Sequence, residues 1–263
     1  MAKQLKDRVV KTEQLTENIY KLTIESEYVC AIATAGQFVN VLCSEGSQAI
    51  LRRPISICAV DRSRGRYDIV FQRKGTGTEL LAQKRSGDLL DIMGPLGKGF
   101  DLNKSYKNIA VAGGGIGIFP LLFLLADSNA AVKNVYLGFR NKKLVVLEKE
   151  FGSYASTLQI ATDDGSYGYN GFVTELLKKD MEKQNYDMIY TCGPMPMLKK
   201  ISKVAETFGT SCQVSMEQRM GCGFGACLVC ACKTKTKTTD DGWQYSHVCK
   251  DGPVFNSSDV IWE

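Results

Sequence analysis

The segment 213–263 holds five of the ten cysteines, and their spacing restricts how this part of the chain can fold. Three of them follow the pattern Cys222-x4-Cys227-x2-Cys230, and Cys249 comes later in the segment. Glycine is frequent here and aliphatic residues are sparse, so hydrophobic burial alone offers little stability. A segment of this kind usually needs a metal or a disulfide to fold.

The cysteine spacing is that of plant-type 2Fe-2S proteins, in which one loop supplies three thiolates and a distant strand supplies the fourth. Gly221, Gly223 and Gly225 allow the loop to fold closely around a cluster and to aim backbone N–H groups at its sulfur atoms. The sequence therefore predicts an iron–sulfur site. Its predicted ligands are Cys222, Cys227, Cys230 and Cys249.

Zinc is the main alternative, because four thiolates also suit a zinc ion. Structural zinc sites prefer paired C-x2-C knuckles, and only Cys227 and Cys230 form one. Free or disulfide-bonded thiols are the third interpretation. We interpret Cys232 as an adjacent thiol that is not a ligand, and His247 as a polar neighbour of Cys249.

The composition excludes other classes of site and partner. Because His247 is the one histidine, sites that need two histidines, such as His-rich zinc sites and Rieske centres, are excluded. The net charge of +5 does not indicate nucleic acid as a partner. The N-terminus MAKQLKDRVV lacks the apolar core of a signal peptide, so we expect a cytoplasmic protein with reduced thiols.

One uncharged run, residues 109–126, is long enough to cross a membrane. Four of its residues between 113 and 117 are glycine, and Pro120 follows them. These residues predict a strand, a glycine turn and a buried helix, so we expect no membrane span.

The N-terminal part, residues 1–100, is predicted to be an antiparallel β barrel or a sandwich. Apolar residues such as Tyr20, Leu22 and Ile24 alternate with polar ones, and glycine-rich or charged clusters separate such runs. The expected strands are residues 20–25, 37–43, 54–60, 66–72 and 88–92, with a short helix over 78–84.

From residue 101 the pattern changes to apolar strands that alternate with helices. This is typical of an α/β domain with a parallel, doubly wound sheet. The expected strands are 108–112, 135–139, 158–162 and 188–192, and the expected helices are 120–126, 171–179 and 197–208. The sequence thus predicts three domains, residues 1–100, 101–212 and 213–263.

Two motifs in the barrel part suit a ligand that carries phosphate and a ring. In Arg52-Arg53-Pro54-Ile55-Ser56, an arginine beside a rigid proline can hold a phosphate while the serine bonds a ring edge. An edge-strand proline with a surface arginine is the simpler interpretation. The Gly75-Thr76-Gly77-Thr78 stretch opens a helix and suits a pyrophosphate, with a plain N-cap at Thr76 or Thr78 as its alternative.

A third motif, Gly113-Gly114-Gly115-Ile116-Gly117, follows a strand and precedes a helix. This arrangement is a phosphate cradle of the dinucleotide type, with a tight strand-to-helix turn as the structural alternative. Cys192-Gly193-Pro194 ends a later strand. Because the carboxyl ends of parallel strands meet at one crevice, we expect both stretches to face it.

In this order the motifs resemble those of the ferredoxin–NADP⁺ reductase superfamily, which binds FAD in a barrel and a nicotinamide nucleotide in an α/β domain. The stretches GCGFGACLVCAC and HVCKDGPVF narrow the resemblance to the electron-transfer subunits of type B, NAD-linked dihydroorotate dehydrogenases. The resemblance covers nearly the whole chain. It implies FAD and a 2Fe-2S cluster as cofactors and NAD as co-substrate.

Carried over by position, the resemblance implies that Arg53 neutralises a phosphate of FAD and that Ser56 lies against its isoalloxazine ring. Ile55 stands where the superfamily usually has an aromatic residue. Asp163 and Asp164 follow a strand and favour a ribose hydroxyl over a 2′-phosphate, hence NAD over NADP. The implied FAD contacts are Arg53, Pro54, Ile55, Ser56, Val70, Phe71, Gln72, Gly77 and Thr78, and the implied NAD contacts are Gly113, Gly114, Gly115, Gly117, Cys192 and Gly193.

The implied function is electron transfer without a catalytic acid, base or nucleophile of the chain's own. Electrons would pass from dihydroorotate to the FMN of a catalytic subunit, then through the cluster and FAD to NAD⁺, in pyrimidine (UMP) biosynthesis. The resemblance implies a heterotetramer with two copies of each subunit. Because an electron must leave the chain, we expect the loop with Gly221, Gly223 and Phe224 to lie at the surface. The alternatives are an NAD(P)H:ferredoxin oxidoreductase, a hydrogenase diaphorase subunit, and a non-enzymatic zinc-binding scaffold.

Overall fold

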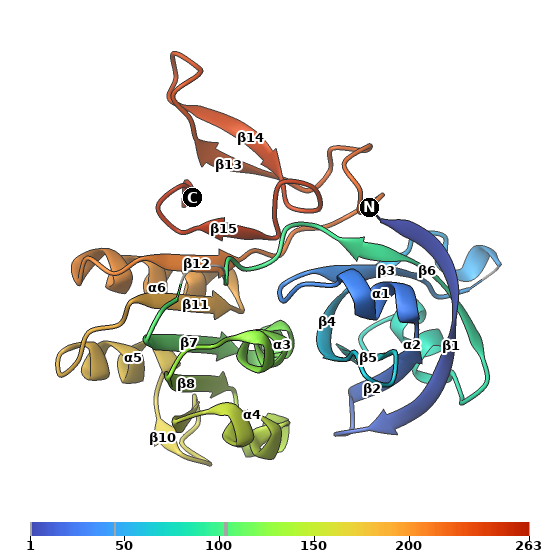
Figure 1. The fold of residues 1–263 in the computed structure, drawn as a ribbon, viewed down its shortest axis with the longest axis horizontal. Helices are drawn as coiled ribbons and strands as arrows, with labels where there is room; N and C mark the ends of the chain where they lie inside the picture. The colour runs from blue at the N-terminus through green and yellow to red at the C-terminus, as the bar shows by residue number, and fades with distance from the viewer. Residues whose placement is uncertain (1, 45, 103–104, 263) are drawn as a thin grey trace.

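The computed structural model describes residues 2–44, 46–102 and 105–262, and Figure 1 shows a barrel beside a layered sheet. Antiparallel strands close the barrel in the order β1-β2-β5-β4-β3-β6, so the barrel is confirmed over the sandwich. The strands are β1 (Lys3–Gln14), β2 (Ile19–Glu25), β3 (Phe38–Leu42), β4 (Arg53–Asp61), β5 (Arg66–Gln72) and β6 (Leu89–Leu96).

The predicted alternation explains how the barrel fills its interior. Leu22 and Ile24 on β2 and Ile69 on β5 are fully buried, whereas Lys21 and Thr23 point outward. Three short helices accompany the strands. They are α1 (Glu27–Ile32), the 3₁₀ turn η1 (Ser47–Ala49) and α2 (Thr76–Ala82).

Helix α2 begins two residues before the predicted start at residue 78. The cause is the Thr78 hydroxyl, which accepts the backbone N–H groups of Lys74 at 2.9 Å and Gly75 at 3.2 Å and so fixes the first turn. The N-cap residue of this helix is Gly75, not Thr76 or Thr78 as predicted, and Thr78 caps the helix start from the third helical position.

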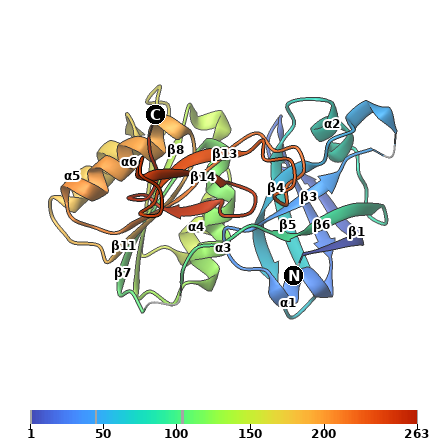
Figure 2. The ribbon, with the colours of Figure 1, turned by 90° about the horizontal axis from the view of Figure 1, so that it is seen from above.

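A second sheet has the strand order β10-β9-β8-β7-β11-β12-β15 and is parallel except for β15, which runs antiparallel to β12. The inner order is that of a doubly wound sheet. Helices α3 and α4 cover one face, and α5 and α6 cover the other (Figure 2). The elements are β7 (Asn108–Gly114), η2 (Gly115–Ile118), α3 (Phe119–Asp127), β8 (Val132–Phe139), η3 (Lys142–Leu144), α4 (Glu148–Tyr154), β9 (Thr157–Thr162), β10 (Tyr169–Asn170), α5 (Val173–Met181), β11 (Met188–Cys192), α6 (Met195–Thr207), β12 (Cys212–Ser215) and β15 (Val254–Asn256).

The uncharged run 109–126 forms β7, η2 and most of α3, as its glycines predicted. All of the α3 side chains from Phe119 to Leu125 are buried. None of the helices in the described ranges is long and apolar enough to cross a membrane.

The C-terminal segment lies over both the sheet and the barrel (Figure 2). After β12 the chain forms a loop, then the hairpin β13 (Ala231–Lys235) and β14 (Trp243–His247), and returns as β15. On the barrel side, the backbone N–H of Lys98 donates to the carbonyl of Gly252 at 2.5 Å. The three-domain division stays a prediction, because β12 covers residues 212–215 and β15 belongs to the nucleotide-domain sheet.

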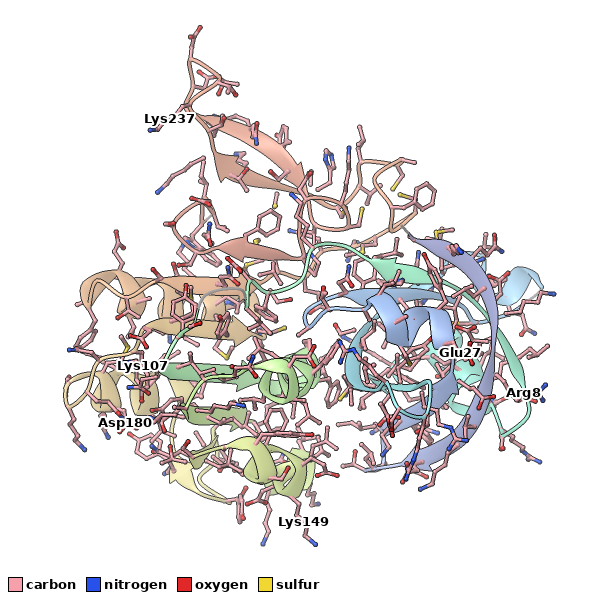
Figure 3. All side chains as sticks on the ribbon, in the orientation of Figure 1. Arg8, Glu27, Lys107, Lys149, Asp180 and Lys237 are labelled. Atoms are coloured by element: carbon pink, nitrogen blue, oxygen red, sulfur yellow. The ribbon has the colours of Figure 1, made fainter. Side chains whose placement is uncertain are left out.

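Figure 3 shows that side chains fill both the barrel and the space around the sheet. Helix α3 also packs against β4, so the sheet and the barrel share a buried boundary. The carboxyl ends of β7 and β11 meet the barrel along this boundary, and the site described next lies there.

Candidate functional site

A cleft of about 250 Å³ lies between the barrel and the carboxyl edge of the sheet. We call it the flavin cleft, after the ligand that the sequence predicts for it. Eight of the predicted FAD contacts line it from the barrel side, together with Phe38 and Lys74; the eight are Arg53, Pro54, Ile55, Ser56, Val70, Phe71, Gln72 and Thr78. The sheet contributes Gly117, Cys192 and Gly193.

Strand pairing brings the barrel residues of the flavin cleft together. In β3 and β4, Phe38 lies opposite Ser56, and Val39 lies opposite Ile55. Ile55 is buried and still lines the cleft, so an aliphatic side chain stands at the position where the superfamily usually has an aromatic one.

Gly77 acts through Arg53 at the end of this cleft where the pyrophosphate of FAD is predicted. A Cβ on Gly77 would lie 2.9 Å from Arg53 Nε and 3.2 Å from its Nη2, so the guanidinium group rests on the bare backbone of α2. Arg53 is held further by a 2.6 Å bond from its Nη1 to the carbonyl of Leu51. A cation fixed beside the start of α2 fits the pyrophosphate of FAD.

A larger cleft of about 620 Å³ adjoins the first along the sheet edge, and we call it the nucleotide cleft. Gln72, Lys74 and Ile116 line both clefts, so ligands in the two would share a wall. The nucleotide cleft is lined by Gly114 and Gly115 of the glycine motif.

The predicted NAD glycines have different roles. A Cβ on Gly117 would lie 2.5 Å from the Cα of Gly193, so the two predicted turns touch each other. Gly113 lies outside the lining of both clefts as described, and a Cβ there would lie 2.9 Å from Ile118 and Leu121. Gly113 therefore serves the packing of α3 against β7.

Of the two acids predicted to select NAD, Asp163 lines the nucleotide cleft. Asp164 accepts the Ser166 N–H at 2.9 Å and its hydroxyl at 2.6 Å, and these bonds hold its pKa below the usual value. Asp164 therefore caps a turn. Arg140 and Lys200, which the sequence analysis did not single out, also line this cleft. The preference for NAD over NADP stays a prediction, because the positive charges of Arg140 and Lys200 favour the 2′-phosphate of NADP, whereas Asp163 favours a ribose hydroxyl.

The thiol of Cys192 lies in the flavin cleft, and burial raises its pKa to about 12. It is therefore protonated at neutral pH and poorly suited to act as a nucleophile. This agrees with an implied function that needs no catalytic nucleophile.

The loop 221–230, which we call the cluster loop, turns its backbone N–H groups inward around Cys222. Phe224, Ala226 and Cys227 donate to the Sγ of Cys222 at 3.5, 3.2 and 3.4 Å. Burial alone would raise the pKa of Cys222, but these donors and the Cys227 thiol outweigh it and lower the pKa to about 6. The loop therefore stabilises a thiolate, the form that ligates iron.

Gly223 and Gly225 have φ of +82° and +92°, a conformation that glycine adopts freely. At Gly221, an added Cβ would lie 3.1 Å from Cys227 Sγ. The three predicted glycines thus allow the tight loop. Gly223 is buried, which corrects the expectation that it lies at the surface, whereas Phe224 is 50% exposed as expected.

The four predicted ligands form two pairs. Cys222 N donates to Cys227 Sγ at 3.3 Å, and Cys249 N donates to Cys230 Sγ at 3.4 Å. Burial and the neighbouring Cys230 thiol raise the pKa of Cys249 to about 12. Within the described ranges, no three His, Cys, Asp or Glu side chains gather closely enough to hold one metal ion. Two pairs of cysteines match the two irons of a 2Fe-2S cluster, which would bind them as thiolates.

Cys232 and His247 are the two residues predicted to be neighbours of the ligands and not ligands themselves. Cys232 is buried on β13, and burial raises its pKa to about 11. His247 pairs with Asp251: its backbone N–H donates to Oδ2 at 2.7 Å, and its Nδ1 lies 3.7 Å from the same oxygen.

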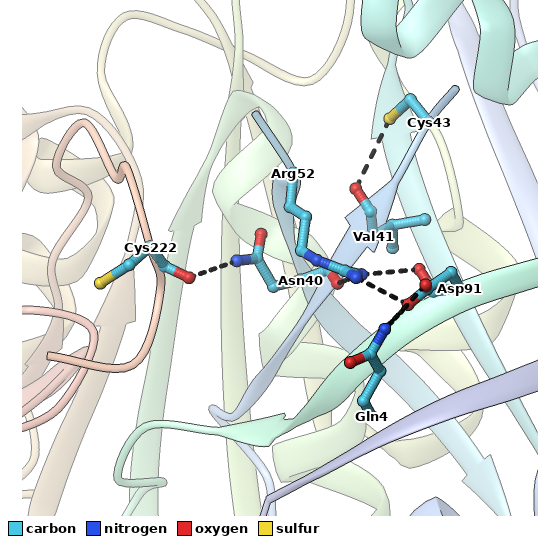
Figure 4. A network of polar contacts seen from close by, with 7 residues as sticks. All are labelled: Gln4, Asn40, Val41, Cys43, Arg52, Asp91 and Cys222. Atoms are coloured by element: carbon cyan, nitrogen blue, oxygen red, sulfur yellow. Dashed lines mark hydrogen bonds and ion pairs between the residues drawn. The ribbon is translucent and has the colours of Figure 1, made fainter. Parts of the chain in front are cut away.

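The segment 215–220 was missed by the sequence analysis as part of the site. Ser215, Met216, Glu217, Gln218 and Met220 line the flavin cleft immediately before the cluster loop. Their position directly upstream of the cysteine motif was the available signal. The other missed residue is Asn40 on β3, whose Nδ2 donates to the carbonyl of Cys222 at 2.8 Å (Figure 4).

Comparison with known proteins agrees with this geometry. Residues 217–261 match the model of the iron-sulfur cluster binding domain of dihydroorotate dehydrogenase B. The dihydroorotate dehydrogenase B (NAD(+)) electron transfer subunit of Desulforamulus reducens is 41% identical over 266 residues, covering 100% of both chains. The protein of the same name from Fusobacterium nucleatum is 41% identical and covers 94% of both.

Solved structures give the same fold. A chain of the NADH-dependent reduced ferredoxin-NADP oxidoreductase, described in work on flavin-based electron bifurcation, is 27% identical, with a TM-score of 0.85 over 100% of this chain and 92% of its own. The Neisseria gonorrhoeae ferredoxin NADP+ reductase, with bound FAD and NADP, is 17% identical, with a TM-score of 0.66 over 80% of this chain and 93% of its own. This second likeness concerns the fold. The full-length relatives at about two-fifths identity establish that the chain belongs to the family of dihydroorotate dehydrogenase B electron transfer subunits.

Proposed function

We propose that this chain is the electron-transfer subunit of a dihydroorotate dehydrogenase B, which carries electrons from a catalytic subunit to NAD⁺. Dihydroorotate would be oxidised on the FMN of the catalytic subunit, and electrons would pass through the 2Fe-2S cluster and FAD of this chain. The reaction belongs to pyrimidine (UMP) biosynthesis, and its proposed place is the cytoplasm. The proposed assembly is a heterotetramer with two copies of each subunit.

The observation that carries this proposal is the continuity of the flavin cleft and the cluster loop. Met216 and Met220 line the cleft, and Cys222 is only two residues beyond Met220. An electron that leaves a flavin in this cleft therefore has a short covalent and packed path to the ligands of the cluster.

The bound FAD would exchange two electrons with a nicotinamide and one with an iron–sulfur cluster, which is why it belongs between them. The chain supplies positions for this exchange. Arg53 holds the phosphate end, Gln72 and Ile116 form the shared wall, and the Gly117–Gly193 contact shapes the edge where nicotinamide would meet flavin.

The catalytic subunit is expected to dock around the exposed side of the cluster loop. Cys227 is exposed there, and Phe224, Leu228 and Val229 are 50%, 56% and 60% exposed around it. Exposed apolar side chains beside a redox centre favour a protein partner over water. Such a partner would receive or deliver electrons over the shortest distance from the cluster.

The test compares the purified chain with its complex. The chain alone should contain one FAD with two irons and two acid-labile sulfides, and it should not reduce NAD⁺ with dihydroorotate. Mixing it with the catalytic subunit should restore dihydroorotate-dependent NAD⁺ reduction. Activity of the chain alone, inactivity of a complex that does form, or one zinc without labile sulfide would contradict the proposal.

A second function is favoured by the close structural likeness to the NADH-dependent reduced ferredoxin-NADP oxidoreductase chain. In that case the cluster loop would serve a complex that exchanges electrons between ferredoxin and nicotinamides. Reduced ferredoxin with NAD⁺, in place of dihydroorotate, separates the two proposals. Turnover with ferredoxin and a lack of complex with the dihydroorotate-oxidising subunit would favour this second function.

A further inference from the structure

We propose that Asn40 is a positioning residue that fixes the cluster loop on the flavin-binding barrel and thereby sets the rate of electron transfer between flavin and cluster. The inference rests on the proposed function, since it needs both cofactors to be present. It concerns a side chain that lies between the two sites and is not itself a predicted ligand of either.

Asn40 joins segments that are far apart in the sequence. Its Nδ2 donates to the carbonyl oxygen of Cys222 at 2.8 Å, and the residue is 1% exposed. In the barrel, Asn40 lies directly opposite Pro54 of the flavin-cleft strand β4. One residue therefore touches a cluster ligand through its side chain and faces a flavin-cleft residue through its backbone.

The cluster loop is shaped to meet this amide. A Cβ added at Gly223 would overlap Asn40 Nδ2, and Gly223 has the positive φ of +82°. The loop backbone therefore rests on the amide itself. Any other residue at position 223 would separate the loop from the barrel.

A network of charged groups holds the backbone of Asn40 in place (Figure 4). Arg52 Nη1 donates to the carbonyl of Asn40 at 3.4 Å and to that of Asp91 at 3.0 Å, and Arg52 Nη2 lies 2.7 Å from Asp91 Oδ1. Gln4 Nε2 donates to Asp91 Oδ2 at 2.8 Å. Residues from β1, β3 and β6 thus meet Arg52, which directly precedes β4, beneath the bond between Asn40 and Cys222, so the barrel side of the contact is rigid.

The oxygen atom of the Asn40 side-chain amide indicates that this residue has a role beyond stability. Asn40 Oδ1 is buried and has no hydrogen-bond partner among the described residues. A buried acceptor without a partner is costly, and a leucine of similar shape would avoid that cost. The barrel nevertheless has an asparagine at this position. Among the described residues, its side-chain amide hydrogen-bonds only to the cluster loop.

The test uses two substitutions of similar size in the full chain with both cofactors. Asn40→Leu removes the donor, and Asn40→Asp replaces it with a group that cannot donate when ionised. Gln37→Leu is the matched control, because Gln37 Nε2 also donates to a backbone carbonyl at 2.8 Å, that of Gly97 within the barrel.

Anaerobic stopped-flow mixing with NADH resolves two steps, bleaching of the flavin and later reduction of the cluster. In both Asn40 variants, flavin bleaching and the KM for NADH should match the wild type, while cluster reduction should slow about 10-fold or more, the usual effect of losing a group that orients a ligand. The EPR spectrum of the reduced cluster should keep its shape in Asn40→Leu, since all four ligands remain. Amides of the cluster loop should exchange hydrogen faster in both variants, and Gln37→Leu should match the wild type throughout.

An unchanged rate of cluster reduction in fully loaded Asn40 variants would overturn the inference. Failure of both variants to assemble a cluster would overturn it too, because Asn40 would then serve cluster assembly. A wild-type chain whose cluster NADH never reduces would instead refute the proposed function, so the two failures are distinguishable.

Discussion

Gly117 and Gly193 touch through their backbones, with the position of an added Gly117 Cβ only 2.5 Å from the Cα of Gly193. One glycine belongs to the turn after β7 and the other to the turn after β11, two neighbouring strands of the sheet. The contact therefore sets the width of the sheet edge where the two clefts meet. Both residues line the flavin cleft beside the nucleotide cleft.

The first prediction is that Gly117→Ala slows the reduction of bound FAD by NADH and lowers stability. The methyl group would push the two turns apart, and overpacking of this kind typically costs about 1–3 kcal/mol. Thermal unfolding and stopped-flow flavin bleaching measure the two effects.

Gly152→Ala is the control for this substitution. Gly152 lies in α4, where an added Cβ would meet nothing closer than Leu158 Cδ2 at 3.9 Å. Alanine inside a helix should raise stability by about 0.5–1 kcal/mol and leave flavin reduction unchanged. Equal effects of the two substitutions would show that the Gly117–Gly193 contact has no special role.

The sequence predicted most elements whose patterns are local. The predicted bounds of β5 (Arg66–Gln72) and β11 (Met188–Cys192) agree with the structure, because clear alternation or a short apolar run ends at polar residues or glycine. Strand β1 (Lys3–Gln14) was missed because charged residues fill both faces of its sequence and the apolar signal is weak. Strand β15 was missed because three residues join the sheet only through their pairing with β12.

The residues of the site also divide into those with a local sequence signal and those without one. Glycine turns, the Arg53 motif and the cysteine spacing are local signals, so their members could be named from the sequence. Asn40 could not, because an asparagine in an apolar strand gives no sign of a partner that lies 182 positions away. Gly113 stays a predicted NAD contact, and its close approach to Ile118 and Leu121 is a tertiary contact that no local pattern shows.

The second prediction concerns the cluster ligands. Cys227→Ser should abolish the cluster, because a hydroxyl is a poor substitute for a thiolate on iron, and the C-terminal segment should loosen with it. Cys232→Ser is the control and should retain the cluster, since Cys232 lies outside the two pairs. Iron and labile-sulfide analysis with the visible spectrum decides. The ligand assignment fails if Cys232→Ser loses the cluster while Cys249→Ser keeps it.

The third prediction is that Arg53→Ala weakens FAD binding by about 1.5–3 kcal/mol, the usual contribution of a hydrogen bond to a charged group. Fluorescence titration of apoprotein with FAD measures the change. Arg64→Ala is the control, because Arg64 is an exposed residue 3.7 Å from Asp61 at the far end of β4. An FAD affinity that falls as much in Arg64→Ala as in Arg53→Ala would refute a specific role for Arg53.

The last prediction concerns the choice of nicotinamide. NADH should reduce the flavin much faster than NADPH, because Asp163 lines the nucleotide cleft and its carboxylate would repel a 2′-phosphate while accepting ribose hydroxyls. Asp163→Asn keeps the shape, removes the charge and should narrow the difference, with Arg140 and Lys200 then free to attract the phosphate. Asp164→Asn should leave the preference unchanged, since that side chain caps a turn through Ser166. Stopped-flow bleaching with both nucleotides measures each ratio, and equal rates for NADH and NADPH in the wild type would show that Asp163 does not select the cofactor.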